Sequence, residues 1–231
     1  MFDGVRPWLA GERSLERLNA AAQSIALKTE NGNPVRFVPP GAKDAYYELK
    51  VYRTGEVETR PDSLHDFFNA LAWLAFPRAK ARLNAMHAAE MSRENGRRGR
   101  LRDLLTIFDE GGVIVECADA SLISLLEGMR WKDLFWRQRE RVREAMRLTI
   151  FGHAVMEKAL EPWPGIACKA LIVRPGADAD QAVQAWLGGL QPGASPRDLT
   201  PLPVFGYPGW APQDEAFYGD ERYFRPSRPD G

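Results

Sequence analysis

The chain contains only three histidines, and one of them is followed four residues later by a glutamate, as His153 and Glu157. Histidine titrates near neutral pH and is the commonest protein ligand of metal ions. Residues four apart on a helix lie on the same face. This pair is therefore a candidate acid–base couple or a candidate pair of metal ligands. A buried, hydrogen-bonded structural pair is the alternative.

The other two histidines fall on consecutive helical patterns separated by Pro77. Each pattern carries a line of side chains at helical spacing, which are His65, Asn69 and Trp73 on the first and Lys80, Asn84 and His87 on the second. We expect the two faces to converge across the bend that Pro77 imposes. In the alternative interpretation Asp66 caps its helix and His87 lies on the surface.

Two adjacent carboxylates, Asp109 and Glu110, end a predicted element just before Gly111 and Gly112. Paired carboxylates at a glycine turn suit divalent cations or acid–base work, although turn chemistry explains them equally well. With the histidines they supply enough ligands for a Zn²⁺, Mg²⁺ or Mn²⁺ ion. The candidate metal ligands are His65, His87, His153, Glu157 and Asp109, and the candidate catalytic residues are His65, His153, Glu157 and Asp66.

Two arginine-rich stretches, residues 93–102 and 137–147, could bind a polyanion such as nucleic acid. The candidates are Arg97, Arg98, Arg100, Arg139 and Arg143. Glu140 and Glu144 are interspersed in the second stretch, so a solvated face with internal ion pairs is the alternative. The formal net charge is zero, so an anionic partner would need a local patch and nucleic acid is not favoured.

The elements that position these residues follow from hydrophobic periodicity. Helices are predicted over residues 14–29, 61–76, 78–96, 120–128, 130–161 and 177–190, and strands over 35–40, 113–119 and 165–175. Residues 45–60 are predicted to form a hairpin or a strand with a tight turn, and residues 100–112 a short strand or helix. The predicted helix over 130–161 is the longest, with a break near Gly152. Along it Met146, Ile150, His153 and Glu157 follow steps of three or four, which places His153 and Glu157 on an apolar stripe.

Composition is that of an ordinary globular protein, with 231 residues, 45% of them apolar and 27% charged. We predict a single α+β domain over residues 1–231, mainly helical with a small sheet, in which the Pro-, Gly- and aromatic-rich residues 191–231 wrap irregularly around the body. The N-terminus lacks a signal-peptide pattern and no apolar stretch could span a bilayer, so we expect a cytoplasmic protein without membrane contact. Cys117 and Cys168 are expected to be reduced.

Several familiar motifs are absent, among them GxxxxGK[ST], GxGxxG, GxSxG and HExxH. Five segments occur in order instead: "TGEVETRPDSLHDFFNALAWLAFPRAKARLNAMH", "LLTIFDEGG", "LFWRQR", "FGHAVMEKALEPWPGI" and "PLPVFGYPGW". With this set the chain resembles the bacterial DUF3025 family over about residues 40–212. The family pattern falls on His65, Asp66, Asn69, Trp73, Pro77, Lys80, Asn84, His87, Asp109, Glu110, Trp136, His153, Glu157 and Trp210. The resemblance implies that these residues belong together and supplies no reaction.

The patterns favour an enzyme-like, hydrolytic site that uses a divalent metal or histidine–carboxylate acid–base chemistry on a small molecule. Asp66 and Asp109 would orient or ligate. We expect the three imidazoles and Glu157 to converge within about 10 Å, the scale of one small-molecule pocket. The alternative is a non-enzymatic binding protein, with a buried polar network and arginine-rich faces that dock a protein partner or nucleic acid.

Overall fold

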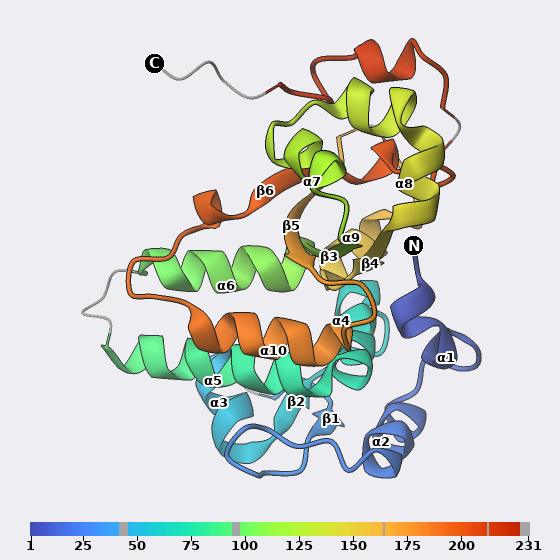
Figure 1. The fold of residues 1–231 in the computed structure, drawn as a ribbon. Coiled ribbons are helices and arrows are strands. Elements are labelled where there is room, and N and C mark those ends of the chain that lie inside the picture. Colours follow the sequence, from blue (N-terminus) through green and yellow to red (C-terminus); the bar gives the residue numbers. More distant parts are fainter. Residues whose placement is uncertain (42–45, 94–97, 164, 212, 227–231) are drawn as a thin grey trace.

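The computed structural model describes residues 1–41, 46–93, 98–163, 165–211 and 213–226 (Figure 1). Helices predominate and the strands form two small sheets, which confirms the predicted α+β class. None of the helices in these ranges is long and apolar enough to cross a membrane.

The larger sheet has the order β4-β3-β5-β6, and it contains β3 (Gly112–Cys117), β4 (Met146–Ile150), β5 (Ala167–Val173) and β6 (Thr200–Pro203). β3 pairs with β5 in parallel and with β4 antiparallel, and β5 pairs antiparallel with β6. Val113 and Val115 join one hydrophobic cluster and Ile114 joins the other, because successive side chains on a strand point to opposite faces. The sheet is therefore buried on both sides.

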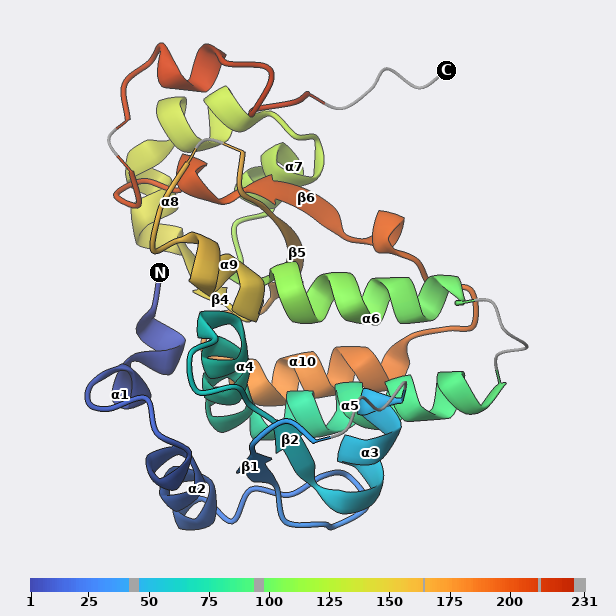
Figure 2. The same cartoon turned by 180° about the vertical axis from the view of Figure 1, so that it is seen from behind.

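A connected group of helices packs beside this sheet, namely α4 (Leu64–Ala75), α5 (Pro77–Arg93), α6 (Arg100–Gly111), α9 (His153–Lys158) and α10 (Ala179–Gly189), of which α6 contacts β3 and β5 and α9 contacts β4. Ser63 is the N-cap of α4, and its side chain accepts a hydrogen bond from the Asp66 amide. α5 packs beside α10 (Figures 1 and 2). The Asp180 carboxylate of α10 accepts from the amides of Arg78 and Ala79 and so caps α5, whereas Asp178 caps α10 itself.

The N-terminal part contains α1 (Arg6–Leu9), α2 (Leu15–Ser24), β1 (Arg36–Val38), α3 (Tyr47–Thr54) and β2 (Glu56–Glu58). It packs against the helices, with α2, β1, β2 and α3 below α4 and α5 in Figure 1 and α1 to one side. The predicted hairpin over 45–60 is wrong, because residues 47–54 are helical and β2 pairs in parallel with β1. Gly55 ends α3 with φ of 75°, and a Cβ there would lie 2.1 Å from the Pro34 carbonyl oxygen.

The predicted long helix over residues 130–161 is also wrong. After α7 (Ala120–Glu127), the chain forms a π-helical segment (Lys132–Arg137), α8 (Arg139–Ala145), β4 and α9. Met146, Leu148 and Ile150 are buried while Arg147 between them is exposed, which is the period of a strand. The three- and four-residue spacing of apolar residues through Met146 and Ile150 is compatible with a helix as well as with a strand. Pairing with β3 makes residues 146–150 a strand.

The C-terminal segment contributes to the core despite its irregular backbone. Among the described residues, short 3₁₀ helices occur in this segment at Pro196–Asp198, Val204–Gly206 and Phe217–Gly219, and another lies near the N-terminus at Asp3–Val5. Phe205, Tyr218 and Phe224 are buried, and the Tyr223 hydroxyl donates to the Ile166 carbonyl. Cys117 and Cys168 are buried free thiols.

Candidate functional site

A polar cavity of about 490 Å³ opens where α3, α4, α5, α6 and α9 meet. Its lining includes all three imidazoles and five carboxylates, namely His65, His87, His153, Glu48, Glu58, Asp66, Asp109 and Glu110. The structure thus brings the three histidines together around one space, although they come from three helices. His87 and His153 are buried, so the interpretation that placed His87 on the surface is wrong.

His65 and His153 are in direct contact. Their Nε2 atoms lie 3.2 Å apart, and their ring centres lie 4.6 Å apart with an angle of 69° between the ring planes. If the two rings pointed straight at each other through their Nε2 atoms, their centres would lie farther apart than 4.6 Å. The line from each ring centre to its Nε2 atom therefore meets the other line at an angle.

Each ring is also held at its other nitrogen. His153 Nδ1 lies 2.8 Å from the Asp109 carbonyl oxygen, and His65 Nδ1 lies 3.0 Å from Glu157 Oε2. A carbonyl oxygen can only accept, so His153 carries a hydrogen on Nδ1 and, when neutral, a lone pair on Nε2. His65 then faces two acceptors, Glu157 and His153 Nε2. It can donate to both only when both of its ring nitrogens carry hydrogens.

Burial dominates the electrostatics of the two inner histidines. It lowers the pKa of His153 to about 4, with Lys80 acting in the same direction and Asp109 opposing. Burial likewise lowers the pKa of His87 to about 4. Both imidazoles are therefore neutral at pH 7. Within the described chain, His87 Nδ1 is buried without a hydrogen-bond partner.

Lys80 joins three of the helices around the cavity. Its side chain is only 3% exposed, and Nζ lies 2.5 Å from Asp109 Oδ1 and 2.8 Å from Asn69 Oδ1. The ammonium also lies 5.6 Å from the ring centre of Trp73. Burial alone would raise the pKa of the Asp109 carboxyl, but Lys80, aided by His153, holds it below its ordinary value. This ion pair fixes the α6 end that presents the Asp109 carbonyl to His153.

Glu48 and Tyr47 belong to the cavity wall but were not among the residues selected from the sequence. Asn84 Nδ2 lies 2.6 Å from Glu48 Oε2, and Asn69 Nδ2 lies 3.5 Å from the Tyr47 hydroxyl. Burial raises the pKa of Glu48 to about 7, opposed by the hydrogen bond from Asn84. Because residues 45–60 were interpreted as a hairpin, these side chains were not placed at a helix start. The four-residue step from Tyr47 to Val51, followed by Gly55, was the available helical signal.

The other predicted site residues have different surroundings. Asp66 accepts from Arg60 Nε at 2.7 Å and from Arg60 Nη2 at 2.9 Å. Burial would raise the Asp66 pKa, but these hydrogen bonds lower it. Glu110 lines the cavity, whereas Glu157 reaches it only through His65. Among the described residues no group of three His, Cys, Asp or Glu side chains is arranged to hold a metal ion.

The candidate polyanion-binding arginines lie in mixed-charge surroundings. Arg98 pairs with Asp103 at 2.7 Å, and Glu140 lies 3.8 Å from Arg139 and 3.3 Å from Arg143. Arg100 is exposed at the start of α6, and Arg97 lies outside the described residues. These pairs match the alternative of a solvated face with internal ion pairs.

Fold and site together define an α+β protein whose helices enclose a histidine- and carboxylate-lined cavity beside a four-stranded sheet. The chain belongs to the family described as protein of unknown function (DUF3025), whose sequence model matches residues 35–228. The resemblance drawn from the five motifs is confirmed, and the match extends beyond both ends of the motif-bearing region. No curated protein and no solved structure matches the chain.

Proposed function

We propose that the cavity is the active site of a hydrolase-like enzyme in which His65 and His153 transfer protons. The observation that carries this proposal is the imidazole pair itself. Each ring is oriented through Nδ1 by a separate acceptor, and the two Nε2 atoms meet at 3.2 Å on the cavity wall. Catalytic acids and bases depend on such orientation by neighbouring groups.

The hydrogen-bond pattern supports a different role for each ring. His153 offers a lone pair at Nε2, so it accepts the proton of an attacking water. His65 carries a hydrogen at Nε2 and donates it to the leaving group, while Glu157 positions the ring through Nδ1. Five carboxylates and one guanidinium, from Arg60, line the cavity. This balance favours neutral or cationic substrates, such as esters or amides, over phosphate esters.

The same geometry supports a second candidate, a divalent metal centre on the two imidazoles. Two nitrogens that ligate a tetrahedral Zn²⁺ at about 2.0–2.1 Å lie roughly 3.3 Å apart, close to the 3.2 Å between His65 and His153 Nε2. Metal-bound histidines usually donate their other ring N–H to a carbonyl or carboxylate, as both do here. A bound metal would lower the pKa of its water. Two protein ligands are fewer than the three that catalytic zinc sites usually have.

One set of variants tests both candidates: His65→Gln, His153→Gln and Glu157→Gln, with Glu90→Gln on α5 as the matched control. We expect hydrolysis of some members of a panel of chromogenic esters and amides. Loss of either histidine should lower kcat by about 10²–10⁴-fold, the usual contribution of general acid–base catalysis. Glu157→Gln should have a smaller effect, and Glu90→Gln none.

Two substrate-independent measurements complete the test. Nitrogen-15 NMR should find the His153 hydrogen on Nδ1. Elemental analysis of protein produced in medium supplemented with Zn²⁺, Mg²⁺ and Mn²⁺ decides between acid–base chemistry and a metal centre. Metal that is present in the wild type and lost in both histidine variants would favour the metal centre. Metal-free protein would leave acid–base chemistry. Unchanged turnover in His65→Gln and His153→Gln, or no turnover of any substrate by the wild type, would contradict the hydrolase proposal.

A further inference from the structure

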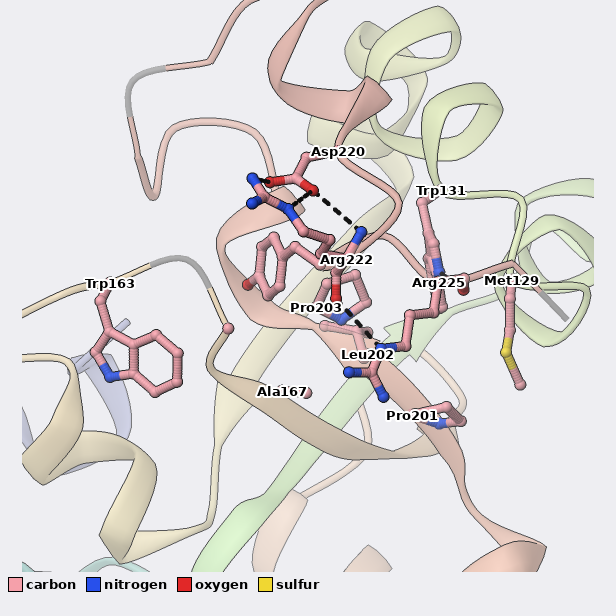
Figure 3. A pocket seen from close by; sticks show the side chains of 12 residues that line it. Met129, Trp131, Trp163, Ala167, Pro201, Leu202, Pro203, Asp220, Arg222 and Arg225 are labelled. Carbon is pink, nitrogen blue, oxygen red and sulfur yellow. Dashed lines mark hydrogen bonds and ion pairs between the residues drawn. The ribbon is translucent and has the colours of Figure 1, made fainter.

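A second cavity, of about 760 Å³, lies where β5, β6 and the C-terminal segment meet (Figure 3). No described residue lines both cavities. In Figure 3, Trp163 lies on one side of this cavity and Met129 and Trp131 lie on the other, with Arg222 and Arg225 between them. We refer to it as the tryptophan–arginine cavity.

The apolar part of this cavity includes an unusually exposed indole. Trp163 is 54% exposed, whereas Trp131 is 4% exposed and donates from Nε1 to the Arg225 carbonyl at 2.8 Å. The Trp163 ring lies against Gly165, where a Cβ would come within 1.9 Å of it. Gly165 also has φ of +136°, which side-chain-bearing residues rarely adopt. The backbone is therefore shaped to accommodate the indole beside the cavity.

The polar part of the cavity has an excess of positive charge. Arg222 is paired with Asp220 through two hydrogen bonds of 2.9 Å each. Arg225 Nε donates to the Arg222 carbonyl at 3.2 Å, and no described carboxylate pairs with its guanidinium. One guanidinium charge is thus left without a carboxylate among the described residues that line the cavity. Arginine recognises carboxylate and phosphate groups through its planar fork of donors.

We propose that the tryptophan–arginine cavity binds a small aromatic anion, with the aromatic ring against Trp163 and the anionic group at Arg225. The volume lies within the roughly 300–1,000 Å³ that is usual for small-molecule sites. Aromatic rings prefer offset or edge-to-face contacts with an indole, which a half-exposed Trp163 leaves available. Charge and shape select the ligand class, and they are independent of the chemistry proposed for the histidine cavity.

The test is calorimetric titration of the full chain with four probes. 1-Naphthoate and 1-naphthyl phosphate combine an aromatic ring with an anion, 1-naphthalenemethanol lacks the charge, and cyclohexanecarboxylate lacks the aromatic ring. We expect one of the two aromatic anions to bind at least five-fold more tightly than either control probe. The stronger of the two identifies a carboxylate or a phosphate as the preferred group.

Variants locate the binding. Arg225→Gln should lower the affinity for the preferred aromatic anion at least five-fold and leave the affinity for 1-naphthalenemethanol unchanged. Trp163→Leu should lower the affinity for both probes. Arg53→Gln, an exposed arginine on α3, is the charge-matched control and should bind like the wild type. Equal affinity of the wild type for the charged and uncharged naphthalenes would overturn the proposal without any variant. Unchanged affinity in a folded Arg225→Gln would overturn it as well.

Discussion

At the residue scale, burial sets the chemistry of the histidine cavity more than any single neighbour does. It keeps His153 and His87 neutral at pH 7 and raises the pKa of Glu48 to about 7. Asp109 is the exception, because Lys80 lies 2.5 Å away and favours the charged carboxylate. Neutral imidazoles and a carboxyl that titrates near pH 7 are the groups that acid–base chemistry requires.

Glu48→Gln tests this description through the pH dependence of stability. The unfolded carboxyl releases its proton near pH 4.5, whereas the folded one holds it to about pH 7. The wild type should therefore lose stability as pH rises across this window, by about 3 kcal/mol more than Glu48→Gln does. Urea unfolding at pH 4.5, 5.5 and 7.5 measures the difference. Glu56→Gln on β2 should keep the wild-type change of unfolding free energy with pH. The same pH dependence in Glu48→Gln as in the wild type would refute the raised pKa of Glu48.

At the element scale, the close contact of α9 with the end of α6 places His153. Gly152 precedes α9, and its amide donates to the Gly112 carbonyl at 2.9 Å. A Cβ on Gly152 would lie 2.5 Å from the Glu110 carbonyl oxygen and 2.6 Å from the Gly111 nitrogen. Only glycine lets the two backbones approach closely enough for His153 Nδ1 to reach the Asp109 carbonyl.

Gly152→Ala should therefore force α9 away from α6. We expect a loss of about 1–3 kcal/mol of unfolding free energy, which is typical of overpacking, and a change in the His153 Nδ1 chemical shift. Gly188→Ala on α10 is the matched control, because its added methyl meets nothing within 4 Å. That variant should be neutral or slightly more stable, since alanine favours helix over glycine. A Gly152→Ala protein with wild-type stability and an unchanged His153 signal would exclude the close-packing explanation.

At the scale of the whole molecule, the larger sheet joins the two hydrophobic clusters. Val113 and Val115 belong to one cluster and Ile114 to the other, and all three are fully buried on β3. Neither cluster can be exposed without disrupting the strand that both share. The two cavities lie in different parts of this framework, which separates the proposed catalytic site from the proposed aromatic-anion site.

We predict that the chain unfolds as one cooperative unit, in keeping with the single α+β domain predicted from its sequence pattern. Far-ultraviolet circular dichroism reports the helices, and tryptophan fluorescence reports residues in both parts of the molecule. In urea the two signals should give coincident transitions with one midpoint. Ile114→Ala should shift both midpoints together, whereas two separated transitions would indicate two domains.

The sequence by itself determined much of what is local. The helical patterns over residues 61–76 and 78–96 correspond to α4 and α5, Pro77 marked the boundary between them, and the β-branched run of β3 indicated a buried strand. It also singled out His65, His87 and His153, because the chain has so few histidines and each carries polar neighbours at helical spacing. Caps, prolines and periodicity act within a few residues, so a single sequence reveals them.

Tertiary structure decided the rest, because pairing and packing involve residues far apart in the chain. Residues 146–150 became β4 since β3 was available as a partner, and their three- and four-residue spacing suited a helix equally well. His153 reaches His65 across 88 positions, and Asp180 caps α5 from about 100 residues away. Glu48 entered the histidine cavity only because residues 47–54 fold as a helix against α5. The sequence could select residues capable of chemistry, but only the fold determined which of them face one another.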